Sequence, residues 1–169
     1  KLSDAEDVLE LKSRGVKNID DAKKWIKKSV DKNGFYLAIS LKNKKKVIGF
    51  RELCHLDWFN FEAGEIGVNI NKKYRGKGYS TEASILLIDY CFNELKFHKI
   101  YADTDPNNKI SQNNLKKMGF KLEGVIRDRR KINGEWTDEL DYGMLKNEWK
   151  KSLPKLKKRL KQKIKSLEK

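Results

Sequence analysis

A basic segment with two glycines, from Asn69 to Ala83, carries the residues with the clearest chemical potential. It reads Asn-Ile-Asn-Lys-Lys-Tyr-Arg-Gly-Lys-Gly-Tyr-Ser-Thr-Glu-Ala, and an apolar-periodic stretch follows it. This pattern predicts a strand that turns directly into a helix. The first N–H groups of a helix have no intrahelical partner, and the helix dipole adds partial positive charge there. Such a turn can therefore bind phosphate oxygens.

Glycine and charge make this turn suited to a diphosphate. Gly76 and Gly78 permit positive φ and remove side chains that would keep a ligand from the backbone. Lysines at positions 72 and 73 add charge beside the turn. A purely structural turn remains the alternative. The candidate binding residues are Arg75, Gly76, Lys77, Gly78, Tyr79, Ser80 and Thr81.

Two common phosphate loops do not fit this segment. A Walker A loop requires Ser or Thr directly after its lysine, but Lys77 is followed by Gly78. The dinucleotide pattern G-x-G-x-x-G requires a third glycine where this chain has Thr81. The sequence therefore excludes both of these nucleotide-binding motifs.

The spacing Arg75-x-x-Gly78-x-Ser80 resembles the R/Q-x-x-G-x-G/A diphosphate loop of the GNAT superfamily of N-acetyltransferases, whose ligand is acetyl-coenzyme A. Ser80 departs from the usual Gly or Ala, but it is also small. The resemblance extends from about Ala22 to Trp149. It looks closest to the RimJ/RimL-type branch, which includes ribosomal-protein N-terminal acetyltransferases as well as polyamine- and antibiotic-acetylating enzymes.

A second block, at the expected distance downstream, supports the resemblance. Asn108, Ser111, Lys117 and Gly119-Phe120 are similar to the Asn…Ser…Lys-x-Gly-Phe block that follows the fifth strand in this superfamily. Many relatives have a Tyr as general acid in this helix, where the present chain has Leu115. Two such matches in the right order favour an enzyme of this superfamily.

The resemblance implies roles for three residues of one strand. The position of Val68 offers the N–H that polarises the thioester carbonyl, and that of Ile70 pairs with the pantetheine arm, which acts as an extra strand between splayed neighbours. Glu65, at the start of this strand, is the first candidate for the general base, reaching the amine through water. A solvated glutamate without a catalytic role is the alternative.

Two further residues carry alternative interpretations. Ser111 is the RimJ/RimL-type substitute for the missing tyrosine, able to hydrogen-bond the leaving thiolate and pass a proton, or it only caps or packs its helix. Asn108 can hold the amides of the coenzyme, or it can simply cap the same helix. No metal site is expected, because His55, His98 and the two cysteines lack ligand spacing.

The expected fold is mixed α/β: the GNAT acyl-CoA N-acyltransferase fold, with a central, mostly antiparallel mixed sheet, splayed central strands, flanking helices and a basic C-terminal helix. Alternation and turn residues predict strands over 35–41, 46–53, 65–70, 99–104, 120–127 and 136–145. Caps and helical periodicity predict helices over 3–14, from 20 or 21 to about 30, 81–95 and 110–118. Residues 57–64 are expected to form a loop.

The chain has 169 residues and a net charge of +15, so an anionic partner is expected. The segment from Lys150 to Lys169 carries ten basic residues against Glu168 alone, which is +9 and leaves +6 for the rest. We therefore expect a GNAT domain over 1–149 and a basic amphipathic helix over 150–169. No membrane-spanning run or signal peptide is found, which favours a cytoplasmic protein. The missing first strand and Met suggest a trimmed amino end.

The leucine and isoleucine stripe of the basic segment allows several interpretations. It can pack on the body or on a second copy, contact ribosomal RNA or another nucleic acid, lie weakly on a membrane surface, or remain a solvated helix. Packing on a second copy would give a homodimer. A non-catalytic GNAT-fold module bound to RNA or the ribosome is the main alternative to an enzyme.

The amine acceptor is ranked by the cost of deprotonation. At pH 7 an α-amine of pKa ~7.8 costs about 1 kcal/mol to deprotonate, whereas a lysine or polyamine amine near 10.4 costs about 4.6 kcal/mol. With no histidine in the matched motifs, an α-amine asks less of the site. This favours a protein N-terminus, as on a ribosomal protein, over spermidine or an aminoglycoside.

Overall fold

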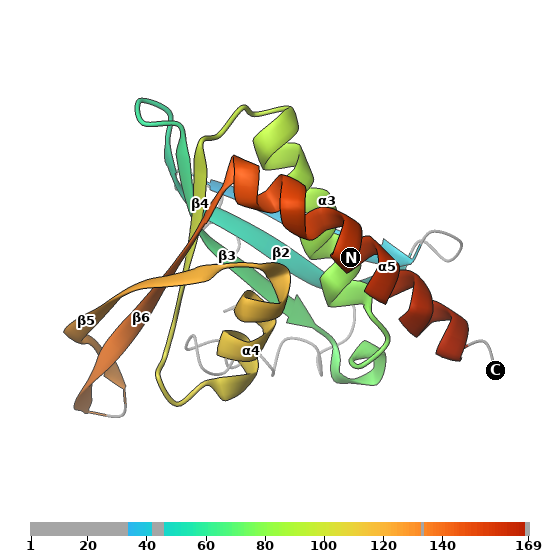
Figure 1. The fold of residues 1–169 in the computed structure, drawn as a ribbon. Coiled ribbons are helices and arrows are strands. Elements are labelled where there is room, and N and C mark those ends of the chain that lie inside the picture. Colours follow the sequence, from blue (N-terminus) through green and yellow to red (C-terminus); the bar gives the residue numbers. More distant parts are fainter. Residues whose placement is uncertain (1–33, 42–45, 133, 168–169) are drawn as a thin grey trace.

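The computed structural model describes residues 34–41, 46–132 and 134–167 (Figure 1). Six strands form one sheet in the order β1-β2-β3-β4-β6-β5. The strands are β1 (Gly34–Leu41), β2 (Lys46–Asp57), β3 (Glu62–Ile70), β4 (Lys99–Thr104), β5 (Lys121–Ile132) and β6 (Glu135–Leu145). The helices are the 3-10 turn η2 (Lys72–Tyr74), α3 (Tyr79–Asn93), α4 (Lys109–Met118) and α5 (Lys146–Leu167). The helices expected over 3–14 and 20–30 lie outside the described residues.

The sheet is antiparallel except at its centre, as the sequence predicts. β1 pairs with β2, β2 with β3, β4 with β6 and β5 with β6 in antiparallel register. The central pair, β3 and β4, is parallel. A parallel neighbour requires a crossover, and α3 supplies it between these two strands. The mixed α/β architecture with a parallel pair at its centre is therefore confirmed.

The hairpin between β2 and β3 is longer than expected. Residues 57–64 were predicted as a loop, whereas β2 continues to Asp57 and β3 begins at Glu62. The Asp57 carboxylate accepts hydrogen bonds from the N–H groups of Phe59 (2.9 Å) and Asn60 (3.0 Å). These bonds close a tight turn, because an aspartate at a turn can satisfy the backbone donors that follow it. Phe59 is almost fully exposed at the tip.

The core lies between the sheet and α3, α4 and α5. α3 buries one side against β2 and β4, and α5 lies across α3 in Figure 1. Buried apolar side chains from six elements and from the α3–β4 connection meet there: Leu53, Ile88, Phe92, Phe97, Ile100, Met118, Met144, Trp149 and Leu156. Burial of this apolar surface is the main stabilising term of such a fold. Among the described residues, no helix is both long and apolar enough to span a bilayer.

The basic C-terminal segment is one helix that packs on the body. α5 begins at Lys146, so the expected division at residue 149 falls within its first turn. Leu156 is buried, and Leu153 and Leu160 are partly buried against the core. The leucine stripe therefore packs intramolecularly, which is the first of the interpretations offered by the sequence.

α5 runs antiparallel to α3. Trp149 donates from its indole N–H to Oδ1 of Asp89, near the end of α3, at 3.0 Å. At the other end, a Cβ on Gly78, the residue that caps the start of α3, would lie 3.1 Å from Cδ1 of Leu160. Each pair of anchors is eleven residues apart on its own helix, about 16 Å along an α-helix. The two helices therefore match in length between these contacts.

Trp149 should contribute strongly to stability. We expect Trp149→Phe to lower the free energy of unfolding by about 2–3 kcal/mol, because it removes buried ring volume and leaves Asp89 without its indole donor. Urea unfolding measures the change. Trp136→Phe, at a tryptophan 60% exposed on β6, is the matched control, with an expected change of about 0.5 kcal/mol or less. Equal effects of the two variants would contradict this account of α5.

Candidate functional site

The basic turn predicted from sequence follows β3 and leads into α3. Asn71 starts it, and its side chain accepts a hydrogen bond from the Lys73 N–H at 2.9 Å, which closes η2. The Nε–H of Arg75 donates to the carbonyl of Ile70 at 2.8 Å, so the side chain ties the turn back to the end of the strand. Arg75, Gly76 and Lys77 are exposed. The turn therefore has a fixed base and an accessible tip.

Both glycines of the turn have the left-handed conformation that the sequence predicts. Gly76 has φ +77° and Gly78 has φ +91°, and Gly78 caps α3 without a side chain. A Cβ on Gly76 would meet no atom within 4 Å. Space for a ligand is thus present directly beside this backbone. The N–H groups of Tyr79 and its neighbours begin the helix next to that space, where an anion is favoured.

The parallel central strands separate immediately after they meet. β3 and β4 pair only at Glu62 with Lys99 and at Ala63 with Ile100, although β3 continues to Ile70 and β4 to Thr104. The ring of Tyr101 packs against Gly64, at the point where the paired register ends. Beyond that point the facing edges of the two strands do not pair. The splay expected between the central strands is therefore present.

Strand alternation shows which groups of β3 face the opening. The Asn71 N–H bonds back to the carbonyl of Ile48 in β2 at 2.9 Å, and the β2–β3 register is regular from residue 66 to 70. Successive residues of a strand direct their backbone groups to opposite sides. The N–H and C=O groups of Val68 and Ile70 therefore point away from β2, toward the gap before β4. Glu65 lies in the same strand, but its side chain is outside the described residues.

α4 begins at the carboxyl end of β4. Asn108 caps this helix, with its Oδ1 accepting from the Ser111 N–H at 3.0 Å. The side-chain oxygen of Asn108 therefore caps the helix, as one of the two interpretations expects, and its side-chain nitrogen takes no part in this cap. Ser111 lies half-buried in the first turn. Because β3 and β4 are parallel, the Arg75–Thr81 turn and this helix start both lie at the carboxyl-end edge of the sheet (Figure 1).

Gln112 supports the start of α4, although nothing in its sequence context pointed to it. Its side chain is buried, and its Nε2–H₂ group donates to the carbonyls of Pro106 (2.6 Å) and Asp105 (3.4 Å). These bonds fix the segment that leads into Asn108. Leu115, where many relatives have Tyr, is partly buried against the core. The described residues contain no group of three or more His, Cys, Asp or Glu that could hold a metal ion.

Comparison with known proteins agrees with this geometry. Residues 1–121 match the acetyltransferase (GNAT) domain. The chain belongs to the GNAT acetyltransferase family. The structure of a GCN5-related N-acetyltransferase from Brucella melitensis has the same fold, with a TM-score of 0.79 at 20% identity over 92% of this chain and 75% of that one.

Curated relatives place the GNAT chain among N-acetyltransferases. It is 31% identical to the uncharacterized N-acetyltransferase YnaD of Bacillus subtilis, over 84% of this chain and 82% of that protein. It is 30% identical to the ribosomal protein uS5-alanine N-acetyltransferase of Escherichia coli, over 69% of this chain and 60% of that protein. It is 32% identical to the Escherichia coli spermidine N(1)-acetyltransferase, over 54% of this chain and 49% of that protein. The reaction class is thus N-acetyl transfer, while these relatives differ in acceptor.

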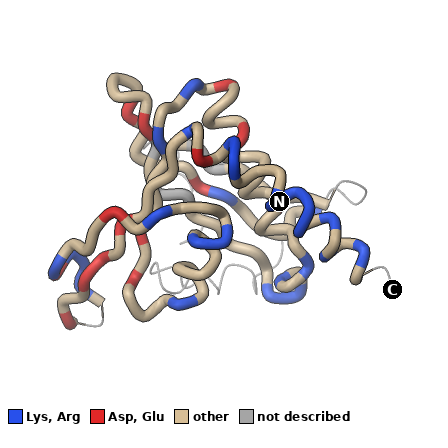
Figure 2. The backbone as a smooth tube through the Cα atoms, viewed as in Figure 1, with Lys and Arg blue, Asp and Glu red and all other residues tan. Residues whose placement is uncertain are grey.

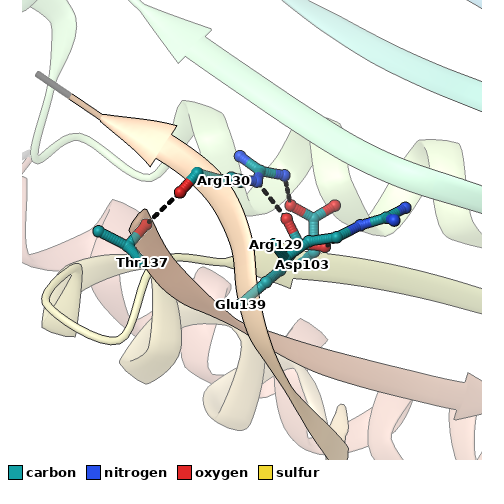
Figure 3. Close-up of polar contacts among 5 residues, drawn as sticks. All are labelled: Asp103, Arg129, Arg130, Thr137 and Glu139. Atoms are coloured by element: carbon teal, nitrogen blue, oxygen red, sulfur yellow. Dashed lines mark hydrogen bonds and ion pairs between the residues drawn. The ribbon is translucent and has the colours of Figure 1, made fainter. Parts of the chain in front are cut away.

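A charged cluster on β4, β5 and β6 was not predicted from the sequence of this GNAT chain. The Arg130 guanidinium donates to Asp103 and to Glu139, and Thr137 donates to the Arg130 carbonyl at 3.4 Å (Figure 3). Nε of Arg129 lies 3.7 Å from Oε1 of Glu139. The members come from three strands and are as far as 36 positions apart, so no local pattern could reveal them. The cluster joins the hairpin of β5 and β6 to the splayed part of β4.

Asp141 lies opposite Asp103 in the β4–β6 register. Partial burial, followed by the nearby Glu139 carboxylate, raises the pKa of Asp141 above its ordinary value. A carboxyl group whose folded-state pKa is raised contributes stability below its unfolded pKa and loses it as the pH rises through the folded pKa. The ionised form of Asp141 is therefore slightly destabilising at neutral pH.

We expect Asp141→Asn to raise the melting temperature at pH 7, since it removes a carboxylate that burial disfavours. The advantage should disappear as the pH falls below about 4, where the wild-type carboxyl is also neutral. Thermal melts from about pH 3 to about pH 8 test this. Glu135→Gln removes the same charge at an exposed position of β6 and is the control. A gain that is independent of pH would contradict the stated cause.

The effect of Gly76 on coenzyme binding can be separated from its effect on the stability of the protein. Gly76→Ala and Gly134→Ala each introduce a Cβ into open space at positive φ (+77° and +92°), so both should cost about 1 kcal/mol of stability. Only Gly76→Ala should weaken acetyl-CoA binding, by about tenfold or more, because only its methyl group stands at the turn. Calorimetric titration measures the affinities. Equal affinities for the two variants would show that this turn does not hold the coenzyme.

Proposed function

We propose that this protein transfers the acetyl group of acetyl-CoA to the α-amine at a protein N-terminus, in the first instance that of a ribosomal protein. The observation that carries the proposal is the opening between β3 and β4, which begins after Ala63 and Ile100 and leads to an exposed glycine turn at the start of α3. A long, amide-rich ligand with a diphosphate at one end fits such a combination.

The turn from Arg75 to Thr81 would hold the diphosphate of the coenzyme. Open space at Gly76 lets phosphate oxygens reach the backbone, and the start of α3 supplies N–H donors. Lys77 is exposed at the tip, and its ammonium lies 6.0 Å from the centre of the Tyr74 ring. Arg75 contributes by anchoring the turn to Ile70 and by its charge.

The open edge of β3 would bind the rest of the coenzyme, which supplies an activated acetyl thioester. An amide-rich chain can pair with the outward groups of Ile70, although the Ile70 carbonyl already accepts from Arg75. The Val68 N–H would donate to the thioester carbonyl and stabilise negative charge that develops on its oxygen. Both roles depend on β4 staying unpaired with this part of β3.

Ser111 would donate a hydrogen bond to the sulfur of the leaving group. The cap by Asn108 uses the Ser111 N–H, so the hydroxyl is not needed for that cap. A serine hydroxyl is a weak acid, so its help is mainly electrostatic. Glu65, in the stretch of β3 just beyond the paired residues, would receive the proton of the amine, directly or through water.

Ser111→Ala should lower kcat by about tenfold to a hundredfold while leaving the KM for acetyl-CoA within about twofold, because the hydroxyl acts on the leaving group. Thiol release from acetyl-CoA measures both constants. Asn114→Ala, at an exposed position of the same helix, is the matched control and should keep the wild-type kcat. A kcat of Ser111→Ala equal to that of the control would remove Ser111 from the reaction.

The two classes of acceptor differ in the free energy needed to form a neutral amine. An α-amine asks about 1 kcal/mol at pH 7 and a polyamine amine about 4.6 kcal/mol, a difference of more than two orders of magnitude in the neutral fraction. The relative that modifies ribosomal protein uS5 supports the first class, and the spermidine relative supports the second. With no histidine in the matched motifs, the lower cost favours the α-amine.

A screen of acceptors tests the proposal directly. Peptides with free N-termini, including those of ribosomal proteins, should release thiol at least about tenfold faster at pH 7 than spermidine or an aminoglycoside at equal concentration. Peptides with a blocked N-terminus and a free lysine are the matched controls. Faster turnover of spermidine would assign the polyamine class instead. Coenzyme binding without turnover of any amine would favour a non-catalytic module.

A further inference from the structure

The C-terminal turns of α5 stand beside the proposed diphosphate turn. Leu160 reaches Gly78 so closely that a Cβ there would lie 3.1 Å from its Cδ1. α5 continues from Leu160 to Leu167, about 10 Å further along its axis. Figure 2 shows lysines and arginines of this helix end and of the turn after β3 on the same side of the molecule.

This end of α5 is strongly and uniformly basic. From residue 149 to 167 the helix contains no Asp or Glu, and within the described part of the chain none of its basic side chains forms a salt bridge. The basic residues from one turn before Leu160 onward are Lys157, Lys158, Arg159, Lys161, Lys163 and Lys165. Cations near a helix C-terminus also interact favourably with its dipole. That effect falls off within the last turn, so it does not account for charges two and three turns earlier.

Helical geometry identifies the side chains nearest the turn. With 100° per residue, Lys157 and Lys163 lie about 60° to either side of Leu160, and Lys161 lies about 100° away on the Lys157 side. All three are exposed. The long, flexible lysine side chain allows these ammonium groups to lie beside Leu160, on the side of α5 that reaches Gly78.

The Arg75–Thr81 turn alone offers limited positive charge to an anionic ligand. Arg75 is engaged with the Ile70 carbonyl, and Glu82, exposed in the first turn of α3, would oppose an anion. Coenzyme A carries a 3′-phosphate in addition to its diphosphate, and this group has to be accommodated beyond the helix start. We propose that Lys157, Lys161 and Lys163 of α5 form the subsite for this 3′-phosphate. The inference rests on the proposed use of acetyl-CoA.

The subsite predicts selectivity between two forms of the coenzyme. The wild-type protein should bind acetyl-CoA about tenfold more tightly than acetyl-dephospho-CoA, which lacks only the 3′-phosphate. The variant K157Q/K161Q/K163Q should reduce this preference to about twofold or less, while its affinity for acetyl-dephospho-CoA stays within about twofold of wild type. Calorimetric titration with both compounds at two salt concentrations gives the ratios, and the preference should weaken at the higher salt.

The same helix provides the matched control. K150Q/K151Q/K155Q removes three positive charges from the first half of α5, on the Trp149 side and away from Leu160, and should keep the wild-type preference. All six positions are exposed, so both variants should show the wild-type melting transition. An equal loss in the control would indicate net charge rather than a subsite.

Other outcomes are distinguishable. Unchanged selectivity of K157Q/K161Q/K163Q would overturn the subsite, and if that variant instead lost salt-sensitive retention of ribosomal RNA, the helix end would be a nucleic-acid contact. Equal weakening toward both coenzyme forms would also overturn it. Wild-type protein that binds neither form would refute the proposed function itself, and the subsite with it.

Discussion

The early parting of β3 and β4 is the constraint on which the rest of the site depends. A backbone N–H or C=O that loses its strand partner must find another donor or acceptor, because leaving it buried and unpaired is costly. Along β3 this demand begins after Ala63 and continues to Ile70. Arg75 satisfies the Ile70 carbonyl at the far end. The remaining outward groups are donors and acceptors that an extended, amide-bearing ligand can use.

α5 keeps the elements around this opening in place. One end holds the C-terminal part of α3 through Trp149 and Asp89, and the other reaches Gly78 through Leu160. Ser152, between them, packs against Gly119, which ends α4 at φ +101°. The helix therefore contacts both helices that follow the splayed strands. Its packing links the core to the geometry of the site, so the basic segment belongs to the folded domain.

Local patterns made most of the fold predictable. The Asn108 cap is one of the two roles that the sequence offered, Gly78 has the positive φ that glycine permits, and β1–β2 and β5–β6 pair as antiparallel neighbours. Each of these features depends on a few adjacent residues. Features set by distant contacts were not predictable. Arg51 is buried beneath α3, where burial lowers its pKa to about 10 and raises that of Cys91 to about 12. The position of α5 beside the Arg75–Thr81 turn likewise depends on packing between Gly78 and Leu160, which are 82 positions apart.

The positive charge at this end of the molecule acts mainly on association. Charges on the turn and on α5 would attract the anionic coenzyme proposed for this site and speed its encounter, and salt screens them over about 8–10 Å. Bound phosphates would neutralise much of this field, so it would add little to the deprotonation of an acceptor amine. That cost has to be met beside β3. An acceptor that needs about 1 kcal/mol for deprotonation is compatible with a weakly assisted site, whereas one that needs about 4.6 kcal/mol requires a dedicated base.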